Sequence, residues 1–290
     1  MDADPPKIHL ALPKGRMHDE VIRLLADASI RVTVTARGYR PRIDLPGFEA
    51  KILKPRAIVE MLAAGQRDVG FAGADWVAEA GADVVELLDT GLDPVRLVAA
   101  APQAILESGR LPDRELIVAS EYTELTRRWI ERRGIKNATF LRSYGATEVL
   151  PPDDADCIVD NTATGSTLEA NGLAILDELM TSSTRLYASR KAMADPAKTE
   201  AIGRFEMLIR AVLEARRRVL IELNVASDNL ERVVEVLPCM REPTIAQLHH
   251  GAGYAVRAAV PRGELTTVIP LIRDRGGTDI VISRPEQIVP

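Results

Sequence analysis

Residues 156–172 read DCIVDNTATGSTLEANG and place a turn rich in hydroxyl side chains directly after a short apolar run. The run CIVD is typical of a buried strand, and TLEANG is typical of the start of a helix. Between them, Thr164, Gly165, Ser166 and Thr167 can turn tightly and present backbone N–H groups and hydroxyls to an anion. A strand, a glycine turn and a helix in this order indicate an α/β unit.

The chemistry of this stretch has two interpretations. Gly165 permits a close approach of the backbone to a ligand, and Asp160 at the end of the strand can accept hydrogen bonds from sugar hydroxyls. Together they suit a ribose 5-phosphate. Alternatively, Thr164 or Ser166 simply caps a helix, as such residues often do. The stretch alone leaves both interpretations open.

The composition is that of a folded globular protein. Of the 290 residues, 46% are hydrophobic and 27% are charged, with both signs interspersed. This length exceeds what one ordinary core fills, so we expect two or three compact units. The formal charge of -5 argues against a general attraction to nucleic acid or to a membrane surface. We therefore expect neither as a partner, and any phosphate chemistry must be local.

Several features predict a cytoplasmic protein. Apolar runs are short, and residues 1–16 carry acidic residues and prolines where an export signal has a basic flank and an apolar stretch. Cys157 and Cys239 lie far apart in apolar segments, which favours reduced thiols over a disulfide. The four histidines have no clustered partners at metal spacing. No protein side chain is therefore assigned to a metal.

Apolar periodicity predicts two α/β units before residue 212. The expected strands are residues 7–13, 67–76, 82–89, 94–102, 116–120, 138–143 and 156–160, and the expected helices are residues 14–29, 57–66, 123–134 and 197–218. The alternation of strands and helices favours a mainly parallel sheet.

From about residue 212 the pattern changes to strand, helix, strand, strand, helix, strand, which is the order of a ferredoxin-like unit. The basic run at 216–218 is typical of a helix end, where cations are favoured by the helix dipole. An anion site is the alternative for this run.

The stretch at 156–173 closely resembles the phosphoribosyl-diphosphate loop of the ATP phosphoribosyltransferase family, whose members open histidine biosynthesis. Other segments resemble the family in its own order: LALPKGRM (10–17), RGYRP (37–41), ILKPRAI (52–58), GFAGADWVAE (70–79) and, from residue 223 to the end, the regulatory domain of the long form. The resemblance covers essentially the whole chain.

This resemblance implies a fold and a domain plan. The expected fold has two periplasmic-binding-protein-like α/β domains that form a catalytic cleft, plus a C-terminal ferredoxin-like α+β regulatory domain. Catalytic domain I is expected over 1–94 and about 181–211, catalytic domain II over 95–180, and the regulatory domain over 212–290.

It also implies a reaction. A ring nitrogen of ATP, N1 of adenine, attacks the anomeric carbon of phosphoribosyl diphosphate and expels pyrophosphate. Such chemistry requires positioning of two polyanions and neutralisation of the departing diphosphate, with Mg²⁺ bound mainly through that group. ATP, phosphoribosyl diphosphate and Mg²⁺ are thus the expected ligands.

The family's site residues carry over by position. Asp160 is expected to hold the ribose hydroxyls, and Thr164 to Thr167 the 5-phosphate. Arg16 and either Arg37 or Arg40 are expected to meet the leaving diphosphate, and Arg37 is preferred because RGY is closer to the family's pattern. The nucleotide-binding residues expected are Leu12, Lys14, Lys54, Gly73 and Asp75.

For the C-terminal unit, the resemblance implies feedback inhibition by histidine in a homo-oligomer that interconverts between dimer and hexamer. Asn224, Thr244 and Ser283 are the candidate histidine contacts. Cap and turn hydrogen bonds are the alternative role for these polar residues.

Three positions depart from the family's pattern: lysine replaces arginine at Lys54, Asp154 stands where glycine is usual in a segment that is one residue short, and Val95 stands where many members carry cysteine. Other classes remain open, namely a small-molecule binding protein of the periplasmic type, a regulatory relative without catalysis, and a salvage phosphoribosyltransferase.

Overall fold

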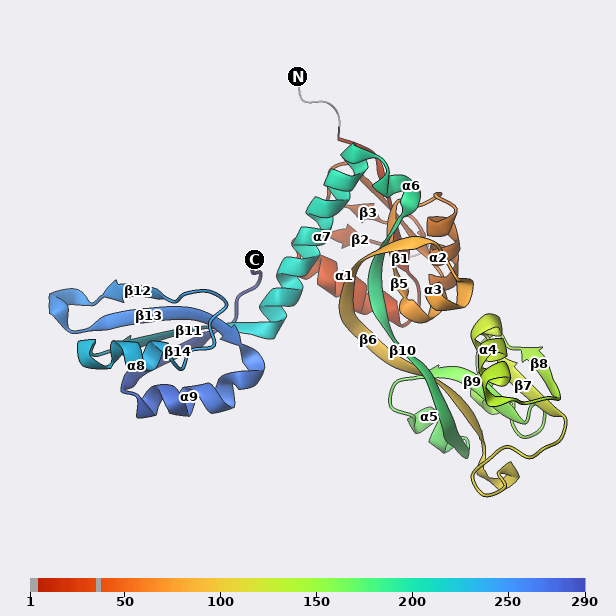
Figure 1. Ribbon diagram of the computed structural model, residues 1–290. Coiled ribbons are helices and arrows are strands. Elements are labelled where there is room, and N and C mark those ends of the chain that lie inside the picture. The colour runs from red at the N-terminus through yellow and green to blue at the C-terminus, as the bar shows by residue number, and fades with distance from the viewer. Residues whose placement is uncertain (1–4, 35–37, 290) are drawn as a thin grey trace. The chain divides into compact units, whose positions relative to one another are not determined.

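Two long antiparallel strands, β6 (Val84–Pro102) and β10 (Leu173–Ser189), form the middle of the main sheet. The computed structural model describes residues 5–34 and 38–289, and Figure 1 shows these two strands running side by side. The sheet has eight strands in the order β4-β1-β5-β10-β6-β9-β7-β8.

Three parallel strands lie on each side of the central pair. They are β4 (Phe48–Leu53), β1 (Ile8–Pro13) and β5 (Val69–Gly73) on one side, and β9 (Cys157–Thr162), β7 (Leu116–Ser120) and β8 (Ala138–Arg142) on the other. Parallel strands of this kind are buried on both faces. All five residues of β5 are buried, as expected.

Among the described residues before 194, the remaining elements are six helices, two short turns and two short strands. They are α1 (Met17–Asp27), α2 (Pro55–Ala63), α3 (Ala74–Ala80), α4 (Thr123–Arg133), α5 (Ser166–Ala170), α6 (Arg190–Met193), the turns η1 (Gln103–Ile105) and η2 (Thr147–Val149), and the short strands β2 (Val32–Thr33) and β3 (Arg42–Ile43). In α2, Pro55 occupies the first helical position, where its missing N–H costs nothing, and Ile58, Val59 and Leu62 form the buried face.

The predicted α/β fold is confirmed, but two details of the sheet were wrong. Residues 82–89 and 94–102 belong to one strand, β6, because its pairing with β10 continues past an irregularity at which Asp93 has a φ of 46°. The middle of the sheet is antiparallel, since β10 pairs antiparallel to both β5 and β6. The second half of β10 was not predicted, because Thr181 to Thr184 are all polar and give no apolar signal of a buried strand.

The chain divides into two compact units, residues 1–23 with 30–203 and residues 24–29 with 204–290. Both α1 and α7 (Pro196–Arg217) contribute residues to each unit. The division of the first unit at residues 94 and 180 stays a prediction. Strand β6 runs through residue 94, and strand β10 runs through residue 180.

The second unit has the predicted ferredoxin-like order. Its elements after α7 are β11 (Arg218–Val225), η3 (Ser227–Asn229), α8 (Leu230–Val234), β12 (Thr244–Gln247), η4 (His249–Gly251), β13 (Tyr254–Pro261), η5 (Arg262–Glu264), α9 (Leu265–Asp274) and β14 (Gly277–Ser283). The strands form an antiparallel sheet in the order β12-β13-β11-β14.

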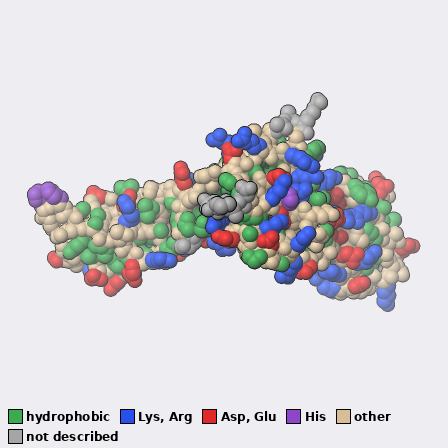
Figure 2. Space-filling view, turned by 90° about the horizontal axis from the view of Figure 1, so that it is seen from above, with side chains coloured by type: hydrophobic (Ala, Val, Ile, Leu, Met, Phe, Trp, Pro, Cys, Tyr) green, Lys and Arg blue, Asp and Glu red, His purple; other side chains and the backbone are tan. Residues whose placement is uncertain are grey.

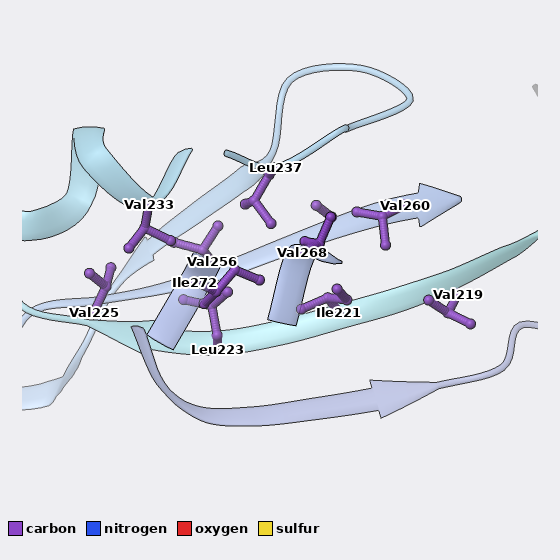
Figure 3. Packing of buried hydrophobic residues seen from close by; sticks show 11 residues of the cluster. Val219, Ile221, Leu223, Val225, Val233, Leu237, Val256, Val260, Val268 and Ile272 are labelled. Atoms are coloured by element: carbon purple, nitrogen blue, oxygen red, sulfur yellow. The ribbon is translucent and has the colours of Figure 1, made fainter. Parts of the chain in front are cut away.

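Alternate residues of β11 point into the core of this unit (Figure 3). Val219, Ile221, Leu223 and Val225 are buried against side chains of α8, α9 and β13, while the residues between them face away. The other face of β11 carries Arg218, Leu220, Glu222 and Asn224.

The surface charges are mixed in sign (Figure 2) and the two cysteines are unpaired. Acidic and basic side chains are interspersed on the face that Figure 2 shows. Cys157 and Cys239 are free, as predicted, and burial raises the pKa of the Cys157 thiol to about 12. Among the described helices, none is both long and apolar enough to span a membrane.

Candidate active site

A cavity of about 310 Å³ opens where the ends of β1, β5 and β9 meet the middle of β6 and β10. Its lining residues are Lys14, Arg16, Met17, Pro55, Gly73, Asp75, Trp76, Asp93, Val95, Asn161, Ser182, Ser183 and Thr184. Ligands of open α/β sheets usually bind outside the carboxyl ends of the strands, where loops leave backbone groups free. This cavity lies at such a place.

The basic side of the cavity comes from the turn between β1 and α1. Gly15 has a φ of 88°, so the backbone reverses there, and Lys14 and Arg16 on either side of it are exposed. Lys14 Nζ lies 3.2 Å from Tyr39 Oη. Arg16 Nε lies 3.9 Å from Asp93 Oδ1, so its guanidinium is only loosely paired. Burial raises the pKa of the Asp93 carboxyl, and Arg16 opposes that rise.

Asp75 is the buried acidic group of the cavity. Its carboxylate accepts hydrogen bonds from Ser182 Oγ at 2.7 Å and from Tyr122 Oη at 2.6 Å. Tyr122 Oη in turn accepts a hydrogen bond from Asn161 Nδ2 at 3.0 Å. Gly73 makes this possible, because a Cβ there would overlap Asp75 Oδ1. Burial raises the pKa of Tyr122, and Asp75 adds to the rise, so the phenol stays a donor.

An aromatic pair lies beside this network. The rings of Trp76 and Tyr122 stack with centroids 4.7 Å apart and an interplanar angle of 26°. Trp76 also lines the cavity, so the site combines an apolar wall with a polar network.

Glu79 holds α3 to α4. Its carboxylate accepts hydrogen bonds from the backbone N–H of Glu124 at 3.0 Å and of Leu125 at 3.0 Å. No side chain of the first turn of α4 caps its own helix, and the hydroxyl of Thr123 accepts instead from Arg142. An anionic cap also suits the positive end of the helix dipole. Glu79 of α3, which lies 45 residues before Glu124, therefore caps α4.

We expect Glu79→Ala to lower the free energy of unfolding by about 2 kcal/mol, because a cap is lost and buried N–H groups lose their acceptor. Glu79→Gln keeps one carbonyl acceptor and should lose less. Urea unfolding measures both. Glu124→Ala is the matched control, since its exposed carboxylate contacts Arg127 and leaves the cap intact. Equal losses in Glu79→Ala and Glu124→Ala would contradict the capping role.

The hydroxyl-rich turn follows β9 directly. Gly165 has a φ of 88° and donates its N–H to Thr162 Oγ1 at 3.0 Å. Ser166 N–H donates to Thr164 Oγ1 at 3.3 Å, and the two hydroxyls lie 2.9 Å apart. Thr164, Ser166 and Thr167 are exposed. The hydroxyls can rotate to donate to an incoming anion.

Asp160 and Asn161 point to opposite faces of β9, as successive residues of a strand do. Asn161 faces the cavity and Tyr122, whereas Asp160 interacts with Thr147, Glu148 and Glu121. Burial raises the pKa of Asp160 to about 6, and the two glutamates add to the rise. Asp160 and Asn161, at the end of β9, thus contribute side chains to two different surfaces.

Comparison with known proteins adds the family. A sequence profile described as ATP phosphoribosyltransferase matches residues 54–211, and one described as HisG, C-terminal domain matches residues 215–286. The ATP phosphoribosyltransferase of Chlorobium phaeovibrioides is 34% identical over 280 residues, which cover 94% of each chain. The chain belongs to the ATP phosphoribosyltransferase family.

The other similarities agree. The ATP phosphoribosyltransferase of Pelotomaculum thermopropionicum is 33% identical over 290 residues, covering 98% of this chain and 100% of the relative. A solved structure, the ATP phosphoribosyl transferase (HisG:HisZ) complex from Thermotoga maritima, contains a similar chain with a TM-score of 0.64 and 25% sequence identity. The match covers 71% of this chain and 98% of the chain in that complex. The family resemblance seen in the sequence is confirmed, and the C-terminal domain places the chain with the long form.

The cavity brings together part of the family's expected site. Lys14, Arg16, Gly73 and Asp75 line it. Leu12 is fully buried in β1, so its side chain does not face the cavity. Lys54 is exposed immediately before Pro55, and Arg37 lies outside the described residues. Arg40 is exposed and adds to the positive field at Glu49.

Sequence reasoning missed several residues of the site. Trp76, Tyr122, Asn161 and Ser182 were not predicted as site residues, because their partners come from other segments of the chain. Val95, which departs from the pattern of many family members, lines the cavity. The position of Tyr122 behind strand β7 was the one usable signal.

The unusual segment PPDDAD lies at the far end of β9 from the hydroxyl-rich turn. Residues 151–154 form a turn in which Asp154 N–H donates to Leu150 O at 2.8 Å. Asp156 then accepts from Ile117 N–H at 2.7 Å and from Arg114 at 2.6 Å. The six residues of β9 separate it from the turn by about 20 Å. The shortened segment therefore does not form part of the loop.

The three candidate histidine contacts share the outer face of the C-terminal sheet, opposite its core. Asn224 is in register with Ala255 of β13, and Thr244 of β12 is in register with Arg257 two residues further along β13. Ser283 is in register with Leu220, which has the same orientation as Asn224. Asn224 Nδ2 already donates to Asp279 Oδ2 at 3.1 Å.

Metal binding by side chains alone has no support in the described part of the chain. Within residues 5–34 and 38–289, no three His, Cys, Asp or Glu side chains group closely enough to hold an ion.

Proposed function

We propose that this chain transfers the phosphoribosyl group of phosphoribosyl diphosphate to N1 of the adenine of ATP, the first step of histidine biosynthesis. A bond forms between N1 and the anomeric carbon while the bond from that carbon to the diphosphate oxygen breaks. The diphosphate leaves with the electron pair, so no covalent bond to the enzyme is needed. Membership of the family over both segments of the chain supports this reaction.

One observation carries the proposal for the site. The Lys14–Gly15–Arg16 turn, the Gly73–Ala74–Asp75 turn and the strand entering the Thr-Gly-Ser-Thr loop all reach one cavity. Two polyanionic substrates need cations near the bond that breaks and donors for the 5-phosphate. These three segments supply both.

For the donor, we assign the 5-phosphate to Thr164, Gly165, Ser166 and Thr167, and the ribose hydroxyls to Asp160. Gly165 supports the assignment because the space at its Cα permits a close approach, with the exposed hydroxyls of Thr164 and Ser166 on either side. Arg16 meets the leaving diphosphate and exchanges its loose contact with Asp93 for phosphate oxygens. Arg37 is proposed for the same group by resemblance alone.

For the nucleotide, we assign Lys14, Lys54, Gly73 and Asp75, with Leu12 contributing through its main chain. Asp75 supports this because both its oxygens keep a further lone pair beside the Ser182 and Tyr122 hydrogen bonds. Trp76 and Met17 give the apolar wall that a purine requires.

Mg²⁺ is proposed to arrive on the diphosphate, where it neutralises charge on the leaving group. It dehydrates reluctantly and commonly binds through phosphates and water, which fits a site without a side-chain cage. The chain's own part is to hold the polyanion with Arg16 and Lys14.

The direct test is pyrophosphate release from ATP and phosphoribosyl diphosphate by the purified chain. Release with ATP and none with free bases supports the proposal. Release only with free bases points to salvage chemistry, and binding of either substrate without release points to a regulatory relative.

Asp160→Asn should stabilise the fold at neutral pH and weaken donor binding. The folded pKa of about 6 exceeds the unfolded value of 3.8, so the stability that the protonated group contributes is present below pH 3.8 and is lost as pH rises through 6. At pH 7.5 the ionised Asp160 costs about 3 kcal/mol, which the neutral amide avoids. Unfolding at pH 4.5 and 7.5, with the KM for the donor, measures both effects.

The expected stability gain is larger at pH 7.5 than at pH 4.5, together with a higher KM for the donor. A gain of the same size at both pH values would show that the titration of Asp160 is not the cause. An unchanged KM would remove Asp160 from the donor site.

Regulation is a further part of the proposal. We assign Asn224, Thr244 and Ser283 to feedback inhibition by histidine, and place the chain in a cytoplasmic homo-oligomer, dimer or hexamer. The common face of the sheet that carries Asn224, Thr244 and Ser283 supports the histidine site. The free thiols of Cys157 and Cys239 suit the cytoplasm. The same assay with histidine, in the native chain and in Thr244→Ala, tests it. Inhibition that survives in Thr244→Ala would remove this residue from the site.

A further inference from the structure

A second cavity, of about 480 Å³, lies within the unit formed by residues 24–29 and 204–290. Its wall is built from the end of α1, the end of α7, the start of β11, η5 and the residues after β14. The lining residues are Ala26, Asp27, Ser29, Val212, Ala215, Arg216, Arg218, Arg262, Arg284, Pro285 and Glu286. Four arginines from separate elements therefore meet around one space.

The arginines are not all neutralised by the wall. Arg216 pairs with Asp27 at 2.7 Å. Arg218 Nε lies 3.5 Å from Glu214, and it is buried without a hydrogen-bond partner among the described residues. Arg262 and Arg284 are exposed and take part in no ion pair within the described part of the chain. Since only Asp27 and Glu286 are acidic among the lining residues, the wall has an excess of positive charge.

The helix dipole explains only part of this arrangement. Arg216 and Arg217 lie in the last turn of α7, where a cation is favoured without any ligand. Arg262 and Arg284 lie on η5 and after β14, so no helix end accounts for their position beside Arg216 and Arg218. Four like charges converge at a cost unless an anion offsets it.

The chemistry of the wall selects the kind of anion. A guanidinium is always charged, and its planar fork matches phosphate oxygens. Beside the arginines, Ala26, Val212, Ala215 and Pro285 give the cavity an apolar side. The volume also falls in the range of about 300 to 1,000 Å³ found for small-molecule sites. We propose that this cavity binds a small organic molecule carrying a chain of phosphate groups.

In this arrangement, the phosphates contact Arg218, Arg262 and Arg284, while Arg216 keeps its bond to Asp27. The organic part lies against the apolar side. Glu286 and Asp27 oppose binding, so affinity should fall with added salt as the attraction is screened.

The test uses the full chain with two probes, inorganic triphosphate and uridine diphosphate, and calorimetric titration. Because the candidate active site also attracts phosphate, all binding variants carry Arg16→Ala. In this background Arg262→Gln with Arg284→Gln should weaken both probes at least about tenfold, since two charge-assisted contacts are lost. Arg217→Gln is the matched control: it belongs to the same basic run, is 65% exposed and does not line the cavity.

The proposal is overturned if the double variant binds both probes as tightly as the Arg16→Ala parent, or if Arg217→Gln weakens them equally. Tight binding of triphosphate with no binding of uridine diphosphate would reject the organic part of the proposal. With Arg16 intact, Arg262→Gln with Arg284→Gln should release pyrophosphate at the native rate without probe. This measurement separates failure of the second cavity from failure of the proposed reaction.

Discussion

Arg16→Ala should lower kcat/KM for phosphoribosyl transfer by about 10²- to 10³-fold, the usual effect of removing one group that stabilises developing charge. The guanidinium is exposed at the cavity, and its one ion pair in the described residues is the loose contact with Asp93 at 3.9 Å. Nothing in the fold depends on that contact, since exposed pairs contribute at most about 1 kcal/mol. The loss should therefore be catalytic.

Two further variants sharpen this prediction. Arg16→Lys keeps the charge but loses the planar fork, so activity should be recovered only in part. Arg23→Ala removes an exposed arginine of α1, the helix that follows Arg16. Arg23 pairs with Glu20 at 2.8 Å, and turnover should stay normal in this variant. Steady-state kinetics with an unfolding curve for each variant measures the effect. Near-normal turnover in Arg16→Ala would reject its role at the leaving diphosphate.

Gly165→Val should abolish saturable binding of phosphoribosyl diphosphate while the protein stays folded. The backbone at Gly165 has a φ of 88°, which costs a residue with a side chain about 1–2 kcal/mol. A new Cβ itself has room, because Ile175 Cδ1 at 3.8 Å is the sole atom within 4 Å. Valine therefore distorts the turn and covers the backbone that a phosphate approaches, without damaging the core.

Gly172→Val is the matched control for backbone strain. Gly172 follows α5, has a φ of 70° and has no atom within 4 Å of an added Cβ, so valine meets the same strain outside the turn. Both variants should lose similar stability, but only Gly165→Val should lose the donor. Titration of the donor, followed calorimetrically, distinguishes them. Equal donor affinity in the two variants would show that the turn does not hold the phosphate.

Much of the fold was predictable because local patterns carried it. The apolar period located α2, α4 and all the strands of the C-terminal unit, and the order of elements predicted the ferredoxin-like sheet. The long central strands were less predictable. Residues 181–184 are all polar, yet Ser182 and Thr184 are buried because the Ser182 hydroxyl pairs with Asp75 of α3 and the Thr184 carbonyl oxygen accepts from the Thr90 hydroxyl of β6. A single sequence does not record such partners.

The candidate site divides in the same way. The residue types of the turn at 164–167 suit an anion, whereas Arg16, Gly73 and Asp75 were expected from the family resemblance. Glu79 showed no such signal, because its role as a cap depends on a helix that starts 44 residues later in the chain. The same holds for Asn161, whose contact with Tyr122 needs β9 and α4 to be already in place.

By itself, the sequence determined the strand, turn and helix of residues 156–172, the family and the order of elements in the C-terminal unit. Each rests on residues close together in the chain. Only the tertiary structure decided that Asp160 and Asn161 face different surfaces, that Glu79 caps α4, and that the basic run at 216–218 meets Arg262 and Arg284. The physical reason is that burial, hydrogen bonding and charge act between side chains brought together by folding, whatever their separation in sequence.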